Sequence, residues 1–412
     1  KVEIGQGIVT ALAQIAADEL DVPLSRIDML SGDTDEAPDE GNTSGSQSIE
    51  IGGASLRLVC AETRALFLAA AAARLGCPPE ALSLAQGSII RDGRPTGHSY
   101  WTLAPLVPLA RDATGAVSPK PRAAHAVIGR SVPRLDLPAK LAGGGFVHDI
   151  QLPGMRHARV LRQPRPGATL ATLDGAAIRR AAGGPLDILR SGDFVAFVAD
   201  SETTARRAAL AAPGHAVWHG LDRLAPEMAE AMWLRALPAD TRRLGAPPAA
   251  HAGLLRHQAS YSRPYIAHAA LGPSCAVAHL HGGHLTLWSH VQGVYPLRQS
   301  VAGALHLDPA AITVHHAHGA GCYGHNAADD AALDAAAIAT LLPGTPIRLR
   351  WQREDEFGFE PLGTASVCRL VATRGPDGRP IVLTAEIWSA PHVGGARGAA
   401  AMLATGVLPN PP

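Results

Sequence analysis

The sequence predicts a multi-domain protein of mixed helix and strand, in the α+β (mixed α/β) class, on three observations. The chain has 412 residues, a length that allows about two to four domains. Hydrophobic residues make up 47% and charged residues 17% of it, which predicts extensive burial and argues against disorder. Stretches with helical and with strand-like spacing of apolar residues alternate along the chain.

The N-terminal part is expected to be mainly helical. Apolar residues recur at helical spacing from Ile8 onward, and again over residues 49–74. Between these helices we expect a short strand at residues 26–30 and a long loop at residues 31–48, rich in small and polar side chains. A loop of that length inside a compact domain is usually functional.

Beyond the second helix the pattern changes several times. Frequent Pro and Gly residues indicate a linker over residues 103–133 and a second connection over residues 221–255. Residues 134–220, between them, are expected to form a small α/β domain. Its strands should span residues 146–150, 156–161 and 194–199, and its helices residues 175–182 and 203–212. After residue 260 we expect strands 275–281, 284–290 and 312–316, helices 297–305 and 327–342, and a hairpin of 367–373 with 381–388.

The composition argues against several classes of function. With 36 basic and 36 acidic side chains, the chain lacks the positive surplus of a nucleic-acid or membrane-surface binder. Its five cysteines include no Cys-x-x-Cys pair, so neither a disulfide framework nor an iron–sulfur site is expected. No apolar run approaches the roughly 18 residues of a transmembrane helix. The chain begins at Lys1 without an initiator Met. We therefore expect a fragment, and its N-terminus does not distinguish a bacterial cytoplasmic from a periplasmic location.

Two turns before the two N-terminal helices form the first candidate site. Their residues are Gly5, Gln6 and Gly7 in one turn, and Thr43, Ser44, Gly45 and Ser46 in the other. Free backbone N–H groups and hydroxyls at helix N-termini are what a phosphate or pyrophosphate group needs. Ordinary helix capping is the alternative. The Walker and Rossmann spacings are absent, so ATP and NAD are not supported.

Two further candidates follow predicted strands in the C-terminal half. Gln292 and Gly293 lie in a polar turn, where the glutamine amide would face a ligand. The alternative is that this amide faces water. The second is a glycine-rich stretch, which lets the backbone approach a ligand closely or serves as a flexible connector. Its residues are Gly321, Cys322, Tyr323 and Gly324.

The clustered histidines suggest a metal site, but their sequence pattern does not favour one. His315, His316 and His318 lie close in sequence, yet no His-Glu-x-x-His motif or carboxylate pairing accompanies them. We therefore assign no metal ligand and expect surface or core histidines. A nucleophilic role for Cys322 would need a partner base that the sequence does not identify.

Ten short motifs, distributed over nearly the whole chain, occur in the same order as in a known family. They are residues 3–8, 32–34, 43–46, 134–140, 148–150, 152–155, 267–274, 288, 291–293 and 319–324. Together they resemble the molybdopterin-binding large subunit of the xanthine dehydrogenase and aldehyde oxidoreductase family. The resemblance is closest to the branch that contains the β chain of isoquinoline 1-oxidoreductase and the B chain of nicotinate dehydrogenase. It implies a molybdopterin-binding segment plus linker (1–133), an α/β hammerhead domain (134–220) and the first part of a molybdopterin-binding domain (221–412).

The resemblance also implies roles for the candidate residues. The turns with Gly5 to Gly7 and Thr43 to Ser46 would hold the pyrophosphate and nucleotide part of molybdopterin, in its cytosine dinucleotide form. Gln292, with Gly293, would lie near the oxo ligands of molybdenum. Gly321 to Gly324 would form the glycine-rich loop beside the metal, so that Gln292, Tyr323 and Gly324 border the catalytic centre. Tyr323 stands where the family has Phe, and Cys322 where it has Gly.

The implied activity is hydroxylation of a small molecule, an N-heteroaromatic compound or an aldehyde, with water as the oxygen source. Molybdenum is held by the pterin, and the glutamate that acts as general base is expected beyond residue 412. Electrons would pass to a small partner subunit with [2Fe–2S] clusters, and a c-type cytochrome is a further candidate acceptor. The alternatives are a non-catalytic scaffold that keeps the fold, and a zinc hydrolase built on His316 and His318.

Overall fold

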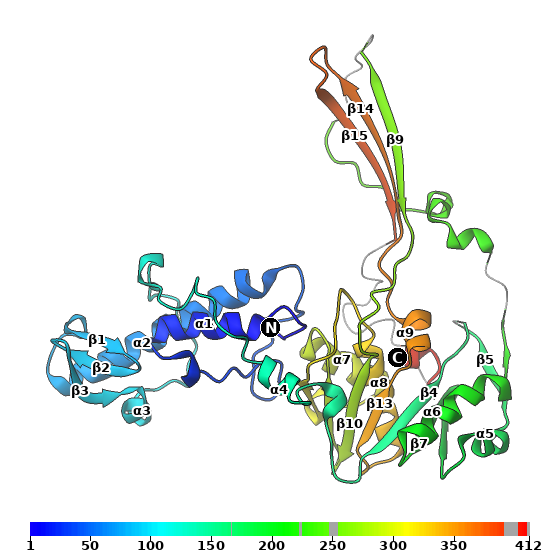
Figure 1. The fold of residues 1–412 in the computed structure, drawn as a ribbon, viewed down its shortest axis with the longest axis horizontal. Helices are drawn as coiled ribbons and strands as arrows, with labels where there is room; N and C mark the ends of the chain where they lie inside the picture. The colour runs from blue at the N-terminus through cyan, green and yellow to red at the C-terminus, as the bar shows by residue number, and fades with distance from the viewer. Residues whose placement is uncertain (166, 222–224, 247–253, 391–402, 410–412) are drawn as a thin grey trace. The chain divides into compact units, whose positions relative to one another are not determined.

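The chain folds into two compact units, each assembled from segments that are distant in sequence. The computed structural model describes residues 1–165, 167–221, 225–246, 254–390 and 403–409 (Figure 1). Unit 1 combines residues 1–153 with 276–320, and unit 2 combines residues 154–275 with 321–412. Both contain helices and strands, which confirms the predicted mixed α/β class. No helix in the described parts of the chain is long and apolar enough to cross a membrane.

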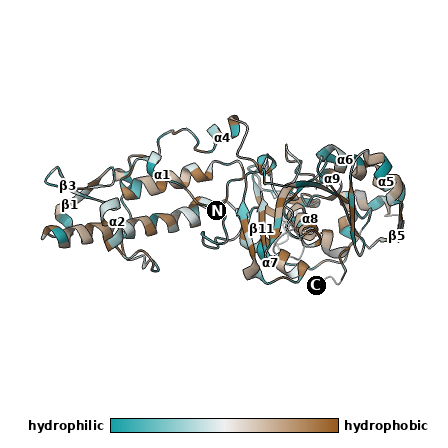
Figure 2. Ribbon diagram, turned by 90° about the horizontal axis from the view of Figure 1, so that it is seen from below, coloured by the Kyte–Doolittle hydropathy of each residue, from teal (hydrophilic) through white to brown (hydrophobic). Residues whose placement is uncertain are grey.

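Unit 1 begins with two helices that match the prediction. They are α1 (Ile8–Leu20) and α2 (Ala54–Leu75), and a π-helical turn (Ser48–Gly53) leads into α2. The two helices lie side by side (Figures 1 and 2). Hydrophobic and hydrophilic residues are mixed along both in Figure 2, as expected of helices that bury one side only.

A small antiparallel sheet follows α2 and was not predicted. Its strands are β1 (Leu82–Ala85), β2 (Ser88–Arg91) and β3 (Arg94–Ser99), and the short helix α3 (Tyr100–Leu103) comes next. Ile89 and Leu103 are buried in one cluster with Phe67 of α2. The β2–β3 turn is Asp92-Gly93, with both residues at positive φ, which is a hairpin signal visible in the sequence. Residues 104–133 contain only single helical turns, as predicted for a crossing segment.

The remaining strands of unit 1 agree with the prediction. β10 (Cys275–His281) and β11 (His284–Ser289) form an antiparallel hairpin, and β12 (Ile312–His316) runs parallel to β11. Helix α7 (Val294–Leu305) connects β11 to β12 and packs on β12. A single bridge between Asp33 and His315 fixes the long N-terminal loop against β12. The short helix α4 (Leu137–Leu141) was not predicted.

Unit 2 contains a sheet covered by helices. Four of its strands lie in the order β13 (Ile347–Arg350), β4 (Arg156–Leu161), β7 (Phe194–Ala199) and β6 (Asp187–Ser191). Helices α5 (Gly175–Ala182) and α6 (Glu202–Ala211) pack on β4 and β7 around buried Ile178 and Phe197, and strands β5 (Thr169–Leu173) and β8 (Ala216–His219) pair beside them. Helix α8 (Ala328–Leu341), buried over most of its length, lies against β13, and α9 (Arg353–Phe359) follows.

A second sheet of unit 2 forms a long narrow ribbon in Figure 1. It contains β9 (Arg256–Arg263), β14 (Ser366–Arg374) and β15 (Pro380–Ser389), all antiparallel to their neighbours. The β14–β15 hairpin was predicted, whereas β9 was not. Within residues 221–255, the described residues contain only the short 3₁₀ helices Pro226–Ala229 and Ala231–Ala236, as expected of a connection.

Two predicted strands were wrong. In place of a strand at residues 26–30, Leu24–Arg26 forms a 3₁₀ turn, because the N–H groups of Arg26 and Ile27 donate back to the carbonyls of Pro23 and Leu24. In place of a strand at residues 146–150, Val147–Asp149 forms another such turn, and the Phe146 N–H donates to the Asp149 carboxylate at 3.1 Å. In both places local hydrogen bonds take groups that a strand would use for pairing.

Candidate functional site

The turn at Gly5 to Gly7 is folded around a carboxylate of its own chain. Gly5 and Gly7 adopt φ of 112° and 80°, and their N–H groups donate to Oε1 of Glu3 at 2.9 and 2.8 Å. The Val9 N–H reaches Oε2 of Glu3 at 3.3 Å. A negative charge is stabilised at a helix N-terminus by these free N–H groups and by the helix dipole. The turn therefore holds an anion, but this anion is the chain's own Glu3 carboxylate, which takes two of the amides that the sequence assigned to a phosphate.

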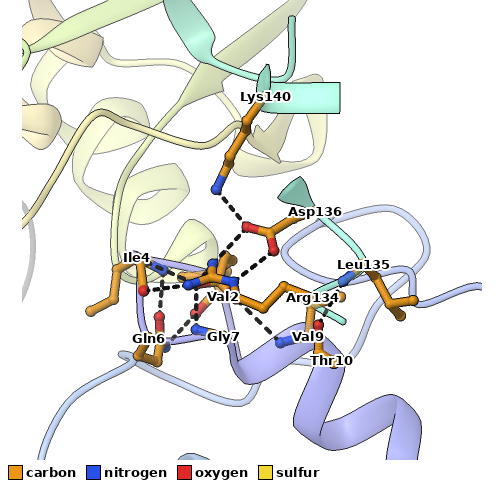
Figure 3. Close-up of polar contacts among 12 residues, drawn as sticks. Val2, Ile4, Gln6, Gly7, Val9, Thr10, Arg134, Leu135, Asp136 and Lys140 are labelled. Atoms are coloured by element: carbon orange, nitrogen blue, oxygen red, sulfur yellow. Dashed lines mark hydrogen bonds and ion pairs between the residues drawn. The ribbon is translucent and has the colours of Figure 1, made fainter. Parts of the chain in front are cut away.

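Arg134 holds this turn from a distant part of the sequence (Figure 3). Its guanidinium donates to the Gly5 carbonyl at 2.9 Å and to Oε1 of Glu3 at 3.3 Å. It also makes two bonds to the Asp136 carboxylate, at 2.9 and 2.7 Å, and Lys140 Nζ donates to the same carboxylate at 2.6 Å. Arg134 and then Lys140 hold the pKa of Asp136 well below its usual range. Asp136 thus stays ionised and neutralises both cations.

The second turn, at Thr43, is joined directly to Gln292. The Thr43 N–H donates to the Gln292 carbonyl at 2.8 Å, and Nε2 of Gln292 donates to the Thr43 carbonyl at 2.9 Å. The Thr43 hydroxyl accepts the Val2 N–H at 2.8 Å. A Cβ on Gly293 would lie 2.1 Å from Oδ1 of Asn42, so a larger residue there would require the Asn42 side chain to move. Among the described residues nothing bonds the second side-chain N–H or the Oε1 of Gln292, so both are available to a ligand.

Ser44, Gly45 and Ser46 follow Thr43 as an exposed loop before the helical turn that begins at Ser48. Gly45 and Ser46 adopt φ of 62° and 59°. Neither the Ser44 nor the Ser46 hydroxyl makes a hydrogen bond to the residues that the structure describes. Two exposed hydroxyls ahead of a helix suit an anionic group, so this loop fits a phosphate better than the turn that Glu3 occupies.

His316 connects the two glycine-containing turns of unit 1. Its Nδ1 lies 3.0 Å from the Val291 carbonyl, next to Gln292, and its Nε2 lies 2.9 Å from the Glu3 carbonyl. Burial lowers the pKa of His316 to about 4, so near neutral pH the ring donates to one of these carbonyls at a time. In the described parts of the chain no group of three His, Cys, Asp or Glu side chains is placed to hold a metal ion. The zinc alternative therefore has no ligand set there.

The glycine-rich stretch belongs to unit 2. Gly321, Tyr323 and Gly324 adopt φ of 112°, 58° and 146°, and a Cβ on Gly324 would lie 2.2 Å from the His268 ring. Tyr323 is exposed. Cys322 is buried, and its Sγ donates to the Gly324 carbonyl at 2.7 Å. Burial raises the pKa of the Cys322 thiol, which argues against a nucleophilic role.

Glu3, Arg134 and His316 all organise the site, although Glu3 and Arg134 had no predicted role and His316 was considered only as a zinc ligand. Glu3 and Arg134 are charged residues inside the motifs that carried the family resemblance. An acidic residue two positions before a glycine turn that starts a helix is a signal that can be read from sequence, since helix N-termini favour acidic partners. The link from His316 to Glu3 spans 313 positions and has no local signal.

Comparison with known proteins gives two family matches. Models of molybdopterin cofactor-binding domains match residues 1–120 and residues 245–404. The B chain of nicotinate dehydrogenase from Pseudomonas putida is 34% identical over 397 residues, which cover 92% of this chain and 32% of that protein. The beta chain of isoquinoline 1-oxidoreductase from Brevundimonas diminuta is 24% identical over 434 residues, which cover 90% of this chain and 54% of that protein.

The chain thus spans a third to a half of the length of these curated relatives. Among solved structures, the aldehyde oxidoreductase from Desulfovibrio desulfuricans aligns with a TM-score of 0.48 and 16% identity. The alignment covers 63% of this chain and 34% of that one.

Proposed function

Since the chain belongs to the molybdopterin cofactor-binding family, we propose that it forms part of the large subunit of a molybdenum hydroxylase. Its substrate would be an N-heteroaromatic compound or an aldehyde, with water as the oxygen source. The observation that most supports the proposal is the double hydrogen bond between Thr43 and Gln292. It joins the part of the chain matched by one molybdopterin-binding model to the part matched by the other.

Different residues of the chain are proposed to contact different parts of the cofactor. The exposed hydroxyls of Ser44 and Ser46, with the Gly45 backbone between them, are proposed to contact the phosphates. Glu3 shapes the Gly5-Gln6-Gly7 turn by accepting the N–H groups of Gly5 and Gly7. The turn would therefore offer the cofactor only those backbone N–H groups that Glu3 does not accept. Gln292, followed by Gly293, would donate its remaining N–H to an oxygen of the bound group. When bound, the cofactor supplies the two-electron redox chemistry that no side chain provides.

The proposal extends to further parts of the enzyme. Gly321, Cys322, Tyr323 and Gly324 are proposed to line the substrate side of the same centre. Molybdopterin cytosine dinucleotide is the proposed cofactor form, and a small [2Fe–2S] subunit the proposed electron acceptor, with a c-type cytochrome beyond it. Two of the relatives are themselves named as enzyme subunits. The proposed division of the chain places a hammerhead domain at residues 134–220, between molybdopterin-binding segments at 1–133 and 221–412.

The test is to produce the chain, together with a [2Fe–2S] partner subunit, in a bacterium that makes the cytosine dinucleotide cofactor. Molybdenum is measured by mass spectrometry and the pterin by the fluorescence of its oxidation product. We expect both to co-purify with the chain, and a Ser44→Ala/Ser46→Ala double variant to lose most of both. Gln299→Met, at an exposed position on α7, is the matched control and should retain them.

The scaffold alternative makes a different prediction in the same experiment. A correctly folded complex without molybdenum and pterin would exclude the hydroxylase proposal and favour the scaffold. A loaded complex that reduces an artificial electron acceptor with isoquinoline or an aldehyde as substrate would support the hydroxylase.

A further inference from the structure

The two faces of the ribbon formed by β9, β14 and β15 (Figure 1) differ in their side chains. Leu370 of β14 pairs with Ala259 of β9 and with Ala385 of β15, and residues paired across strands share a face. Alternation along each strand gives the other members of this face, which we name face A. Its larger side chains are those of Tyr261, Cys368, Leu370, Leu383 and Ile387. Face A is therefore mainly apolar.

The opposite face of the ribbon is covered by another part of the chain. The 3₁₀ helix Ala231–Ala236 contacts all three strands, and the guanidinium of its Arg235 lies 4.7 Å from the centre of the Trp388 ring. On the same face Arg369 donates to the Glu386 carboxylate at 3.2 Å. The side chains of this face thus already have partners within the chain.

Face A has no comparable cover within the part of the chain that the structure describes. The side chains of Leu383, Ile387 and Tyr261 are 66%, 67% and 61% exposed. Strands about 4.8 Å apart that rise about 3.4 Å per residue give a three-stranded face of roughly 400 Å² over the eight residues of β9. Single exposed apolar side chains are common, but a contiguous apolar surface of this size marks a site of interaction.

The ribbon is also positively charged, although the charges of the whole chain balance. Residues 256–263 and 366–389 contain five arginines and two acidic residues, and each acidic residue is paired with an arginine. The same alternation places Arg263 and Arg374 at the two ends of face A. Both donate to backbone carbonyls rather than to carboxylates. Face A is thus an apolar surface with a cation at each end and no acidic side chain.

These features argue against two occupants of face A. A second copy of the chain would bring arginines against arginines. Two such faces would also bury only roughly 800 Å² together, below the roughly 1,200–2,000 Å² of a stable interface. A membrane surface is disfavoured because face A has one aromatic residue, Tyr261, and no lysine, whereas elements that lie on membranes are rich in Trp, Phe and basic residues.

A single helix fits the dimensions of face A. A helix is about 10–12 Å in diameter, and the outer strands of a three-stranded ribbon lie about 10 Å apart. The arginines at the two ends are eight positions apart along β14 and its pairing with β9, or about 27 Å, which a helix of about 18 residues spans. Packing a helix on a sheet is a common way to bury an apolar sheet face.

From this geometry we propose that face A is the docking surface for an amphipathic helix of a partner protein, with an apolar stripe and Asp or Glu residues near both ends. The stripe would cover Leu383, Ile387 and Tyr261, and the acidic residues would pair with Arg263 and Arg374. Face A contains none of the residues proposed to hold the cofactor, so the inference goes beyond the proposed function and does not depend on it.

The test measures binding of two fluorescein-labelled synthetic peptides to the full chain by fluorescence anisotropy. Both peptides are helix formers with leucines along one face, and they are about 18 residues long to match face A. One carries glutamates near both ends, and the other carries lysines at the same positions. We expect the glutamate peptide to bind about tenfold more tightly at about 50 mM salt, and this preference to shrink at about 500 mM salt because salt screens the charges.

Two double variants separate the apolar and the charged contributions. Leu383→Ser/Ile387→Ser should weaken binding of the glutamate peptide about tenfold or more, because it removes exposed apolar surface that the helix would bury. Arg263→Gln/Arg374→Gln should weaken the glutamate peptide about three- to tenfold, as expected for two exposed ion pairs, and should not weaken the lysine peptide. Val217→Ser, at an exposed apolar position on β8, is the matched control and should bind both peptides as the unaltered chain does.

Equal affinity for the two peptides would overturn the proposal, and so would unchanged binding of the glutamate peptide by the folded serine variant. Two further measurements address the other occupants. Self-association in sedimentation velocity that the serine variant loses would assign face A to a second copy instead. Binding to phosphatidylglycerol vesicles that the serine variant loses would assign it to a membrane. None of these measurements needs molybdenum or pterin, so a failure of this proposal is distinguishable from a failure of the proposed function.

Discussion

Thr43 and Gln292 are hydrogen-bonded to each other twice, although 249 positions separate them. One bond joins backbone to backbone, and the other uses the side-chain amide of Gln292. Neither residue belongs to a helix or a strand, so no regular ladder supports the contact. The pair therefore helps to hold the end of the N-terminal loop, at Thr43, against the turn after β11.

Replacement of Gln292 by Met should loosen this loop. The variant keeps the length of the side chain but removes the donor to the Thr43 carbonyl, and a hydrogen bond of this type contributes about 1 kcal/mol. We expect amide hydrogens of residues 41–47 to exchange about fivefold faster, as measured by mass spectrometry. Gln299→Met should change nothing in that loop. Equal exchange in the two variants would show that the backbone bond alone holds Thr43.

Elements that depend on local sequence patterns were predicted, and elements that depend on other contacts were not. Helices α1 and α2 and the hairpin around Gly282 and Gly283 were predicted because apolar spacing and turn residues act locally. The strand predicted at residues 146–150 failed because the Asp149 side chain captures the Phe146 N–H, a competition that apolar spacing does not report.

Glu3→Gln tests the carboxylate that shapes the first turn. Glu3 is 2% exposed and accepts three backbone N–H groups as well as Arg134. Hydrogen bonds to a charged group contribute roughly 1.5–3 kcal/mol. The neutral amide should therefore speed hydrogen exchange at Gly5 and Gly7 by at least about tenfold. The exposed Glu36→Gln is the control. If both variants protect these amides as the unaltered chain does, the charge of Glu3 does not hold the turn.

The candidate site was predicted only in part, because some of its residues are placed by contacts between distant parts of the sequence. The turns at Gly5 to Gly7 and at Thr43 to Ser46 were visible as small residues before helices. That Glu3 fills the first turn depends on contacts with Arg134 and His316, which lie more than a hundred positions away. Long-range contacts of this kind, an ion pair and a side-chain to backbone hydrogen bond, leave no periodic pattern in the sequence.

Gly324→Ala should destabilise unit 2. The added Cβ would lie 2.2 Å from the His268 ring, at a φ of 146° that favours glycine. Overpacking and backbone strain together cost roughly 2–4 kcal/mol. The measurement is the urea midpoint of unfolding, followed by circular dichroism. Gly303→Ala, in α7, adds a Cβ with nothing within 4 Å and should be neutral or stabilising, because alanine favours a helix. A Gly324→Ala midpoint equal to that of Gly303→Ala would mean that His268 moves away at no cost.

Asp330 should make the free energy of unfolding of unit 2 depend on pH, and one substitution should remove that dependence. Its side chain on α8 is 2% exposed, Oδ1 accepts the Leu403 N–H at 2.8 Å, and Oδ2 has no hydrogen-bond partner among the described residues. Burial raises the pKa of Asp330 to about 7. In the unfolded chain the same group loses its proton near pH 4. Between these values the folded state holds one more proton than the unfolded state.

The free energy of unfolding should therefore fall as the pH rises from about 4 to about 7, by roughly 1.4 kcal/mol per pH unit from this group, and stay level above that. Asp330→Asn resembles the protonated acid and keeps the acceptor for Leu403, so its stability relative to the unaltered chain should increase between pH 5 and pH 7. Urea unfolding at these two pH values measures the difference, and exposed Asp112→Asn should show none. Parallel pH profiles for the Asp330→Asn variant and the unaltered chain would mean that Asp330 is already ionised in the folded protein, with solvent reaching its Oδ2.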